Sequence, residues 1–509
     1  MTSLFARKPI ADLLAEGENP GGLRRVLGVG DLVMLSIGAV IGAGIFSSIG
    51  TAAAGEVLPS GQVVRYGAGP ALVFSFILLG VVCALAALCY AELSSMIPQA
   101  GSAYAYSYAT LGEFVAWIIG WDLILEYAVG NIAVAVAWSG YFTSLLSGVG
   151  VDLPGWLTHG YRTALLSSNP EVHALLESAP RVAGIPVLLN VPAFLIVLCI
   201  TWLLAIGVKE SVRANNIMVA VKLAVLALFI VAGALHIDTA NYKPFAPNGW
   251  LGIRQGAAIV FFAYIGFDAI STAAEETRNP QRDMPRGILM GLAICTLIYV
   301  VVGVVATGLV PYTQLRAADP LARALEVAGL PNVSWIVAAG AVVSLTAVLL
   351  VFQYGQPRIF YAMARDGLLP PWAAKVHPRY RTPFVTTIIT GVVVALGSLV
   401  MDENEIYDLT NIGTLSAFAI VCVGVLALRI KEPHRPRPFR APFIWLVAPL
   451  GALACVYVMF GLPPHAWERF GIWLAIGLAL YFAYGYKHST LRRGAPPVPL
   501  EPPPPMDKS

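Results

Sequence analysis

The chain has 509 residues, of which 58% are hydrophobic and 12% charged, and its mean hydropathy is +0.74. Soluble domains carry roughly 25% charged residues, so this composition excludes a soluble domain and indicates a polytopic membrane protein. The net charge of +3, without a block of basic residues, excludes a nucleic-acid-binding protein. All six cysteines fall within apolar runs, so we expect neither a disulfide framework nor a metal site, and no cofactor.

Apolar runs long enough to cross a bilayer, about 20 residues each, recur along the chain. We count twelve such runs and predict an all-α protein with twelve transmembrane helices. They lie at 29–54, 70–97, 112–148, 185–207, 211–235, 252–277, 286–310, 333–363, 384–400, 405–428, 441–461 and 467–487. With the N-terminus inside, 23 of the 32 Lys and Arg residues are cytoplasmic, which predicts that both ends of the chain are cytoplasmic.

The runs divide the chain into five parts. We expect a cytoplasmic N-terminal segment at 1–28, a first group of five spans at 29–235, a second group of five at 252–428, two further spans at 441–487, and a disordered cytoplasmic tail at 488–509. The N-terminus lacks a short apolar core with a cleavage site, so no signal peptide is expected.

The first span contains GAVIGAGIFS at 38–47, in which Gly42 and Gly44 flank Ala43 near the expected middle of the membrane. Glycine costs about 1 kcal/mol relative to alanine in a helix, so the helix is predicted to be weak at its centre. One interpretation is close helix packing through small residues. The other is a broken helix whose freed backbone groups bind a solute.

A second weak point lies in the sixth span, in FFAYIGFDAISTAAEETRNP at 261–280, where Gly266 interrupts the helix and Asp268 follows. Spans 1 and 6 are therefore interrupted at matching places in two groups of five spans. Because five is odd, the second group must enter the membrane from the opposite side. This arrangement is typical of an inverted repeat that binds its solute between two discontinuous helices, and it favours the binding interpretation.

The freed backbone groups of the two breaks suit opposite charges. At span 1, the outer half-helix would present the amides of Ala43, Gly44 and Ile45 to an anion such as a substrate carboxylate, with Ile41 and Gly42 beside them. At span 6, the first half-helix would end in unpaired carbonyls. Carbonyl groups at a negative helix end suit an ammonium group, and these belong to Phe262, Ala263 and Ile265. An anion site beside a cation site describes a zwitterionic α-amino acid.

The chain resembles a bacterial member of the cationic amino acid transporter family, within the amino acid-polyamine-organocation superfamily. The stretches that carry the resemblance are IGAGIF at 41–46, PQAGSAYAYSYATLGE at 98–113, FFAYIGFDAISTAAEETRNP at 261–280, GQPRIFYAMARDGLLP at 355–370 and, more weakly, NIGTLSAF at 411–418. The resemblance implies a LeuT-type fold, a 5+5 inverted repeat with discontinuous helices 1 and 6 and two additional spans. It also implies amino acid uptake by alternating access. Ala43 departs from the Ser or Thr that many relatives carry between these glycines.

Lys222 lies about 16 Å along the fifth span from its cytoplasmic start. A lysine at this depth is expected to face the protein interior, either as a structural hydrogen-bond donor or in a functional role. The resemblance implies that its ammonium replaces the sodium ion of sodium-coupled relatives and bridges spans 1 and 8. Burial disfavours the charged form, which would allow the lysine to bind and release a proton. Ser344 or Thr346 in span 8 is the expected polar partner.

Two acidic residues also lie deep in predicted spans. Glu126 in span 3 matches an acidic position of the family and is expected either to meet a cationic side chain or a proton, or to pair with a nearby polar group. Asp268 is expected to accept amides at the start of the inner half of span 6. Tyr264, Phe262 and Phe352 are candidates for a gate or for the side-chain pocket, with simple packing as the alternative.

These residues predict a proton-coupled L-amino acid symporter of the inner membrane, and not an enzyme. The chain has no nucleotide-binding loop for a pump and no nucleophile–base pair in its spans. An amino acid exchanger, or a sensor that binds without transport, remains an alternative. The substrate is either small and neutral or cationic. The expected partners are an L-amino acid, a proton and membrane lipid, and a small membrane subunit would leave no mark in this sequence.

Overall fold

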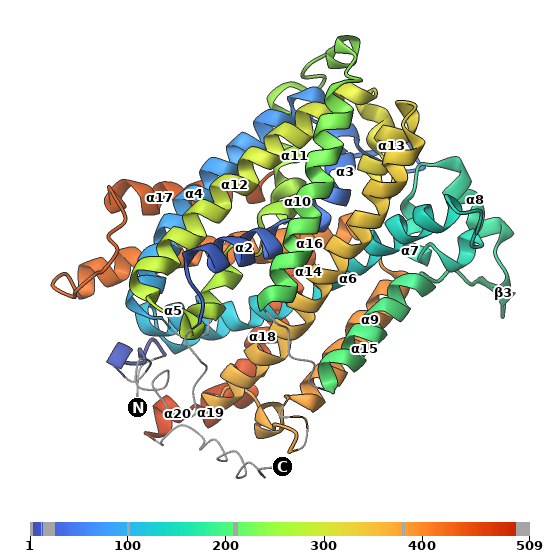
Figure 1. Cartoon of the computed structure of the whole chain (residues 1–509). Helices are drawn as coiled ribbons and strands as arrows, with labels where there is room; N and C mark the ends of the chain where they lie inside the picture. Colours follow the sequence, from blue (N-terminus) through green and yellow to red (C-terminus); the bar gives the residue numbers. More distant parts are fainter. Residues whose placement is uncertain are drawn as a thin grey trace, which may run out of the picture.

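The computed structural model describes residues 4–11, 13, 26–98, 102–206, 212–378, 380 and 382–494, without the side chains of residues 212–215, 272 and 275. Helices dominate the described chain (Figure 1). The two small sheets are antiparallel pairs, β1 (Gly55–Val57) with β2 (Val63–Tyr66) and β3 (Arg181–Val182) with β4 (Ile185–Pro186).

The helices up to the sixth predicted span include long helices within the apolar runs and shorter ones between them. In chain order they are α2 (Val29–Val40), η1 (Gly44–Ser48), α3 (Ile49–Ala54), η2 (Gly69–Ala71), α4 (Leu72–Met96), α5 (Ser102–Thr110), α6 (Glu113–Ser147), η3 (Gly155–Leu157), α7 (Tyr161–Leu166), α8 (Pro170–Ser178), α9 (Val191–Ala205), α10 (Val212–Ala234), η4 (Thr239–Tyr242), α11 (Gly249–Val260), η5 (Phe261–Tyr264) and η6 (Asp268–Glu276).

The remaining helices complete the described chain. They are α12 (Pro280–Leu309), η7 (Tyr312–Leu315), α13 (Pro320–Val327), α14 (Pro331–Arg365), η8 (Pro371–Ala374), α15 (Phe384–Val400), α16 (Glu403–Lys431), α17 (Ile444–Met459), α18 (Pro464–Leu480), η9 (Tyr481–Gly485), α19 (Tyr486–His488) and α20 (Thr490–Arg493).

Local sequence explains where the long helices begin. Pro280 and Pro331 occupy the first turns of α12 and α14, where the missing amide of proline costs no hydrogen bond. Asp402 caps α16, because its carboxylate accepts the amides of Asn404 and Glu405. Gly112 precedes α6 with a φ of +105°, a conformation that glycine adopts without strain.

Seven helices of the described ranges are long and apolar enough to cross a membrane, and two bent pairs raise the number to nine. The bent pairs are α2 with η1–α3, at 45°, and α17 with the helix that begins at Pro464, at 115°. The apolar helices α9 and α15 are shorter than the others. The sequence prediction of twelve spans is therefore matched only in its general form, a bundle with many apolar helices.

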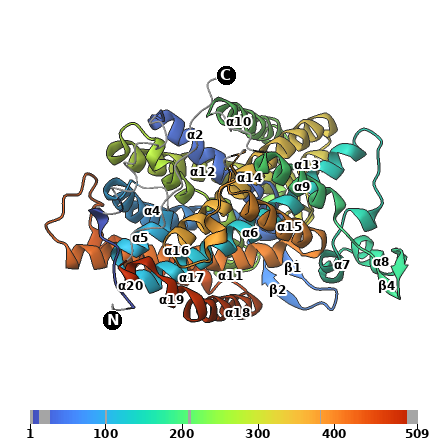
Figure 2. The same ribbon diagram turned by 90° about the horizontal axis from the view of Figure 1, so that it is seen from below.

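The long helices pack around α6. In the apolar part of α6, 83% of the residues are buried, against 33% in α10, so α6 is central and α10 peripheral. α6 packs along α14 and α16, while α4 and α2 pack against α12 (Figure 1). Both views place α7 and α8 at the end of the molecule remote from α20 (Figure 2).

The C-terminal segment remains folded beyond the predicted boundary of the disordered tail at residue 488. Ser489 caps α20, and the guanidinium of Arg492 binds the buried carboxylate of Glu113 at 2.7 Å. The described chain is thus helical at Thr490–Arg493, past residue 488, where the tail is predicted to start. Residues 495–509 of the predicted tail, and most of the N-terminal segment before residue 26, lie outside the described residues.

Candidate functional site

Two helices of the bundle break close to their centres. α2 ends at Val40, Ile41 is extended, and the chain resumes a helix at Gly44 with the π-helical turn η1. In the second helix, η5 ends at Tyr264, Ile265 is extended, and Gly266 has a φ of +111°. The glycines that the sequence analysis singled out therefore lie at real interruptions of both helices.

The two breaks touch each other through their backbones. A Cβ atom on Gly44 would lie 2.1 Å from Cα of Ala263, and one on Gly266 would lie 2.9 Å from the carbonyl oxygen of Ala39. Real Cβ atoms do not approach other atoms so closely, so both positions require glycine. The sequence predicted two breaks at matching positions, and the structure brings them into contact.

Lys222 caps the first break. Its side chain is fully buried, and its Nζ donates to the carbonyl oxygens of Gly38, at 2.8 Å, and Ile41, at 2.9 Å. These carbonyls belong to the last turn of α2, where the break removes their helical partners and the helix dipole is negative. The ammonium thus replaces hydrogen bonds that the broken helix has lost.

The expected partner of Lys222 in the eighth span is not observed. Ser344 is buried, but its hydroxyl has no hydrogen-bond partner among the described residues. The hydroxyl of Thr346 donates to the carbonyl of Val342 and accepts from Trp138. The ammonium instead binds the carbonyls of Gly38 and Ile41, so Lys222 joins the fifth span to the first, and no hydrogen bond within the described chain joins it to Ser344 or Thr346.

The amides of the first break are only partly available. The amide of Ile45 donates to the carbonyl of Gly42 at 3.2 Å, so it is used within the chain. The amides of Gly42, Ala43 and Gly44 have no backbone acceptor within the described residues. The predicted anion site therefore narrows to three successive amides, and Ile45 does not contribute its amide.

Neutral donors engage two of the three carbonyls that were predicted to be unpaired at the second break, those of Ala263 and Phe262. The hydroxyl of Tyr299 donates to the carbonyl of Ala263 at 2.7 Å and also lies 2.9 Å from the carbonyl of Val40. The carbonyl of Phe262 accepts the amide of Ile265 at 3.4 Å. Each carbonyl oxygen has two lone pairs, so these bonds leave one acceptor position on each.

Sequence reasoning missed Tyr299 and Asn411. Tyr299 lies in α12 and bridges the two broken helices through one hydroxyl group. Asn411 in α16 donates its amide to the carbonyls of Ala258 and Ile259, at 2.8 and 3.0 Å. The sequence offered one signal for each residue. Tyr299 carries a hydroxyl group within the apolar run at 286–310, and Asn411 is the first residue of NIGTLSAF.

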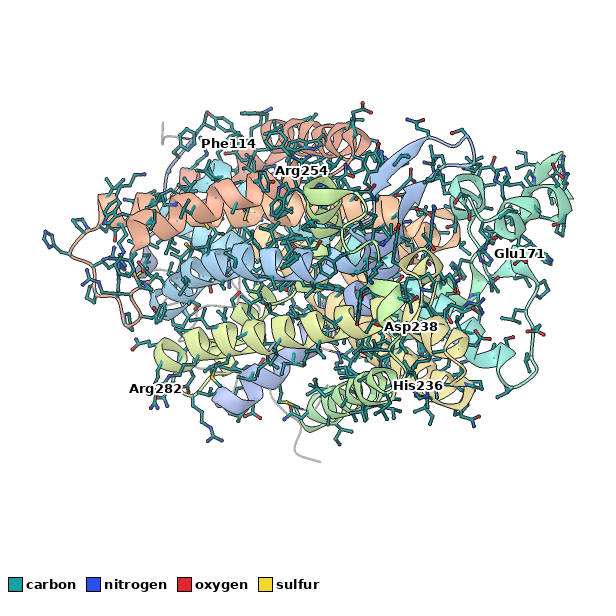
Figure 3. The ribbon with its side chains drawn as sticks, turned by 90° about the horizontal axis from the view of Figure 1, so that it is seen from above. Phe114, Glu171, His236, Asp238, Arg254 and Arg282 are labelled. Atoms are coloured by element: carbon teal, nitrogen blue, oxygen red, sulfur yellow. The ribbon has the colours of Figure 1, made fainter. Side chains whose placement is uncertain are left out.

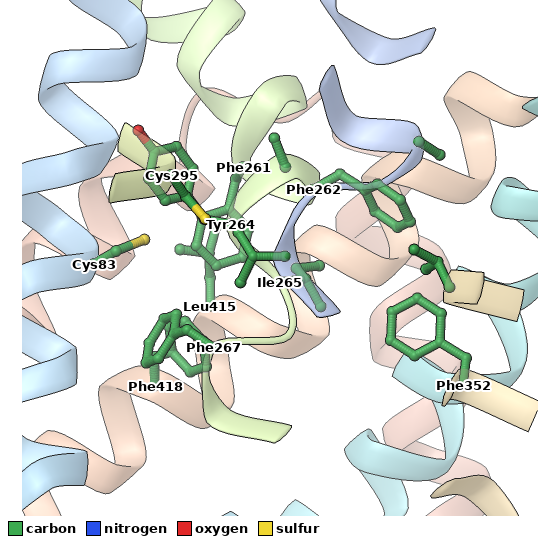
Figure 4. Close-up of a cluster of buried hydrophobic side chains, with 14 of the residues drawn as sticks. Cys83, Phe261, Phe262, Tyr264, Ile265, Phe267, Cys295, Phe352, Leu415 and Phe418 are labelled. Carbon is green, nitrogen blue, oxygen red and sulfur yellow. The ribbon is translucent and has the colours of Figure 1, made fainter. Parts of the chain in front are cut away.

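Aromatic rings surround a small glycine next to the breaks. A Cβ on Gly130 would lie 3.7 Å from the ring of Phe262 and 3.8 Å from the ring of Phe352. Phe262 also contacts Tyr407, with ring centroids 4.6 Å apart, and Phe352 contacts Tyr127 at 5.5 Å. In Figure 4, Phe262 and Phe352 lie on one side of Ile265, and Tyr264 lies on the other. The surroundings of Gly130 are therefore apolar.

Tyr264 points away from Phe262 and Phe352. Its hydroxyl donates to the carbonyl of Phe76 in α4 at 2.8 Å, and its ring packs against Tyr299. The side chain is fully buried in this position. In this structure Tyr264 thus anchors the second break to α4 and does not cover the first.

The two deep carboxylates are held by hydroxyl groups. Glu126 accepts a hydrogen bond from Thr414 at 2.8 Å. Asp268 lies 3.5 Å from the hydroxyl of Ser102, and its second oxygen has no partner among the described residues. Both carboxylates are buried, and neither makes an ion pair with a described side chain.

Contacts close the structure on both sides of the breaks. On one side, Ser47 of η1 donates to Glu403 of α16 at 3.0 Å. On the other side, the amides of Val26 and Leu27 donate to the carbonyl of Glu276 at 2.8 and 2.9 Å. These hydrogen bonds tie the first broken helix to α16 on one side of the breaks and to the end of η6 on the other.

Comparisons with known proteins agree with this architecture. A family model described as "Amino acid permease" matches residues 27–480. Two proteins of Bacillus subtilis are similar over almost their entire length: a methylthioribose transporter (44% identity, 97% of this chain and 100% of the relative) and a branched-chain amino acid permease (45%, 96% and 99%). The vacuolar cationic amino acid transporter 4 of Arabidopsis thaliana is 38% identical, over 85% of this chain and 68% of the relative.

Proposed function

The chain belongs to the amino acid permease family, and from this premise we propose that it moves a neutral L-amino acid into the cell by proton-coupled symport. Its family and its transporter relatives make it a multi-pass membrane transporter and not an enzyme. The contact between Lys222 and the broken end of α2 carries the proposal of proton coupling.

The proposed topology has twelve crossings and both ends of the chain in the cytoplasm. The seven long apolar helices, the bent first span, the shorter helices α9 and α15, and α17 and α18 taken as two separate crossings supply that number. The excess of Lys and Arg on one side supports the orientation in the inner membrane. In this topology the spans at 29–235 and 252–428 form the two halves of a LeuT-type inverted repeat, and 441–487 forms the last two spans.

The position of Lys222 supports proton coupling. Protonated, the lysine binds both carbonyls at the end of α2 and holds the half-helix in place. Deprotonated, it loses its charge and one donor, and its attraction for the negative helix end falls. The conformation of the first break thus depends on the proton, and a buried lysine exchanges that proton most readily when the site opens.

The amino acid would bind at the meeting point of the breaks. The three amides from Gly42 to Gly44 suit its carboxylate, and the second lone pairs of the Phe262 and Ala263 carbonyls, with the carbonyl of Ile265, suit its ammonium. The apolar rings of Phe262 and Phe352 beside Gly130 suit an aliphatic side chain. Glu126 is buried and makes no ion pair with a described side chain, and burial disfavours a charged carboxylate, so we propose that Glu126 takes a proton and does not select a cationic substrate.

Tyr264 and Asp268 have supporting roles in this proposal. Tyr264 fixes the second break to α4, and Asp268 begins η6 next to Gly266. The branched-chain permease of Bacillus subtilis supports a neutral aliphatic substrate. A second candidate is methylthioribose, because the relative named for its transport is equally similar. That solute has no carboxylate for the amides of the first break.

The test is uptake into proteoliposomes with and without an inward proton gradient. The labels are L-leucine, L-alanine, L-arginine and methylthioribose, and the proteins are wild type, Lys222→Ala and Ser344→Ala. Ser344→Ala is a matched control, because the hydroxyl of Ser344 is buried near the same helices but has no hydrogen-bond partner among the described residues. We expect the gradient to drive accumulation of leucine or alanine in wild type and Ser344→Ala only.

Each other result contradicts a specific part of the proposal. Accumulation of arginine alone would contradict the neutral substrate, and accumulation of methylthioribose alone would contradict the amino acid. Exchange with preloaded substrate, without net accumulation under any gradient, would identify an exchanger. Binding without either movement would identify a sensor.

A further inference from the structure

Three arginines form an exposed row at one end of α12. Arg282 and Arg286 lie four residues apart near the start of α12, which places them on one face of that helix, and Arg278 lies two residues before the helix begins at Pro280. All three side chains are exposed, and none makes an ion pair with a described carboxylate. Figure 3 shows Arg282 at the rim of the molecule, at the end of its helix. Three exposed guanidinium groups without a partner form a concentrated positive charge.

The described carboxylates nearest in sequence or in packing do not pair with this row. Asp283 is buried on another face of α12. Asp31, at the start of α2, accepts hydrogen bonds from the amide of Gly28 at 3.0 Å and from Asn216 at 3.4 Å. Glu276 is half-buried, and no ion pair joins it to a described arginine. No described carboxylate therefore competes with an external anion for the row.

The same face of α12 continues as an apolar track. Beyond Arg286 it presents Met290, Leu297 and Val304, which are 49%, 67% and 38% exposed. Large apolar side chains with this exposure, on a helix that crosses the membrane, face lipid. The three side chains continue the row of arginines at helical spacing, so one molecule could touch both features.

The dimensions of this face match one leaflet of a bilayer. Arg286 and Leu297 are separated by roughly 16 Å along a helix, about half of the hydrocarbon thickness of roughly 30 Å. A ligand for this face needs an anionic group at the arginines and a chain of about this length below it. Guanidinium groups bind phosphate oxygens with paired hydrogen bonds.

We propose that the row of Arg278, Arg282 and Arg286, together with Met290 and Leu297, binds an anionic phospholipid of the cytoplasmic leaflet. The phosphate lies between the guanidinium groups, and an acyl chain follows the apolar track of α12. The inference rests on the proposed membrane orientation, which puts this end of α12 at the cytoplasmic surface. Because α12 also carries Tyr299 at the breaks, the bound lipid holds a helix that contacts the proposed transport site.

The test measures lipid binding without any transport assay. Purified protein in detergent is titrated with phosphatidylglycerol or phosphatidylcholine, and bound lipid is counted by native mass spectrometry. The variants are Arg278→Gln with Arg282→Gln and Arg286→Gln, and the same three positions changed to Lys. A control carries Arg181→Gln, Lys243→Gln and Arg323→Gln, three exposed cations on the segments that this topology places outside.

We expect wild type and the control to prefer phosphatidylglycerol at least about tenfold, and the triple Gln variant to bind it on the order of a hundredfold more weakly, from about 1 kcal/mol for each cation. The triple Lys variant should retain most of the binding. The three side chains are exposed and without ion pairs to described carboxylates, so the Gln variant should keep its thermal stability in detergent. Unchanged binding by the Gln variant, an equal loss in the control, or equal binding of phosphatidylcholine would overturn the proposal.

A water-soluble glycerol phosphate, which has no acyl chain, tests the arginines separately from Met290 and Leu297. If it binds as tightly as phosphatidylglycerol, the assignment of Met290 and Leu297 to an acyl chain is wrong. The result does not depend on amino acid uptake, so a failure of the proposed transport function would leave lipid binding intact. Conversely, loss of lipid preference in a protein that still accumulates amino acids would contradict only the lipid site.

Discussion

The two helix breaks present the same chemical problem and receive different solutions. Each break frees backbone carbonyls at the end of a half-helix inside the bundle. At the first break a charged lysine, Lys222, occupies the carbonyls of Gly38 and Ile41. At the second break neutral groups, the hydroxyl of Tyr299 and the amide of Asn411, bind the carbonyls. A neutral cap is permanent, whereas a lysine cap can lose a proton, so the cap of the first break can respond to protonation and the neutral caps of the second cannot.

The largest effect should follow from making the first break resemble the second. Lys222→Gln keeps a neutral donor for the carbonyls of Gly38 and Ile41 but removes the titrating group. We expect substrate binding to survive while gradient-driven accumulation is lost. The measurement is uptake with and without a proton gradient beside equilibrium binding of the same label. Accumulation that still follows the gradient would show that the lysine is only a structural cap.

A substitution at the contact between the breaks should be almost as damaging. The methyl group of Gly44→Ala would lie 2.1 Å from Cα of Ala263, and overpacking of this kind costs about 1–3 kcal/mol or more. We expect lower thermal stability and little uptake. Gly471→Ala is the control, because nothing lies within 4 Å of a Cβ at that helical position. Equal behaviour of the two variants would mean that the breaks separate easily.

The neutral cap of the second break should matter less. Tyr299→Phe removes the hydroxyl that binds the carbonyl of Ala263, and an unsatisfied buried acceptor costs about 1–3 kcal/mol. We expect a lower unfolding temperature and reduced uptake that still follows the proton gradient. Tyr90→Phe is matched, because the buried hydroxyl of Tyr90 has no partner among the described residues. A loss of gradient dependence in Tyr299→Phe would erase the distinction between the two breaks.

The smallest effect is expected at a buried acid outside both breaks. Burial, with the charges of Glu56 and Glu405, raises the pKa of Asp402 to about 7, against about 3.9 in the unfolded chain. Between these values the folded protein keeps a proton that the unfolded chain releases, so the contribution to stability is present below about pH 4 and is lost as the pH rises to about 7. Asp402→Asn keeps a side-chain oxygen for the cap of α16 but cannot titrate, so this variant should not lose stability through position 402 as the pH rises.

Unfolding temperatures at about pH 5 and about pH 8 check this effect in wild type and Asp402→Asn. The difference between the two pH values should be smaller in the variant, and amino acid uptake should keep its dependence on the gradient. Asp402→Ala, which removes the cap, should be less stable at both pH values. If the unfolding temperature changed equally with pH in wild type and Asp402→Asn, a group other than Asp402 would cause the pH dependence. If Asp402→Asn lost the dependence of uptake on the proton gradient, Asp402 would take part in proton coupling together with Lys222.

The sequence predicted the features that depend on neighbouring residues alone, namely the helix breaks and the depth of Lys222. Gly42, Gly44 and Gly266 weaken their own helices, and the depth of Lys222 follows from counting residues, so breaks and a buried cation were visible in the sequence. The partner of Lys222 was not, because Ser344 and the carbonyl of Gly38 are equally polar until the rotation of each helix is known. A carbonyl is present at every residue and gives no signal of its own.

The neutral caps, Tyr299 and Asn411, could not be predicted from the sequence either, because their partners also depend on how the helices pack. Tyr299 lies in an apolar run where aromatic residues normally pack, and only the contact between two distant breaks gives its hydroxyl two nearby carbonyls. The availability of the Ile45 amide also depended on the exact path of the chain after Gly42. The class of fold followed from composition and run length, whereas the number of crossings and the inverted repeat remain predictions from pattern and resemblance.

The contact between Gly44 and Ala263 also constrains how this chain can evolve. The atom that a side chain at position 44 would meet is the Cα of Ala263, with its amide nitrogen at 2.4 Å. These atoms belong to the backbone, which every amino acid shares, so no replacement of Ala263 can make room. Most buried clashes can be relieved by a second mutation that shortens the neighbour, but this one offers no such compensation. A lineage that lost Gly44 could recover only by reverting to glycine or by shifting one of the two helices.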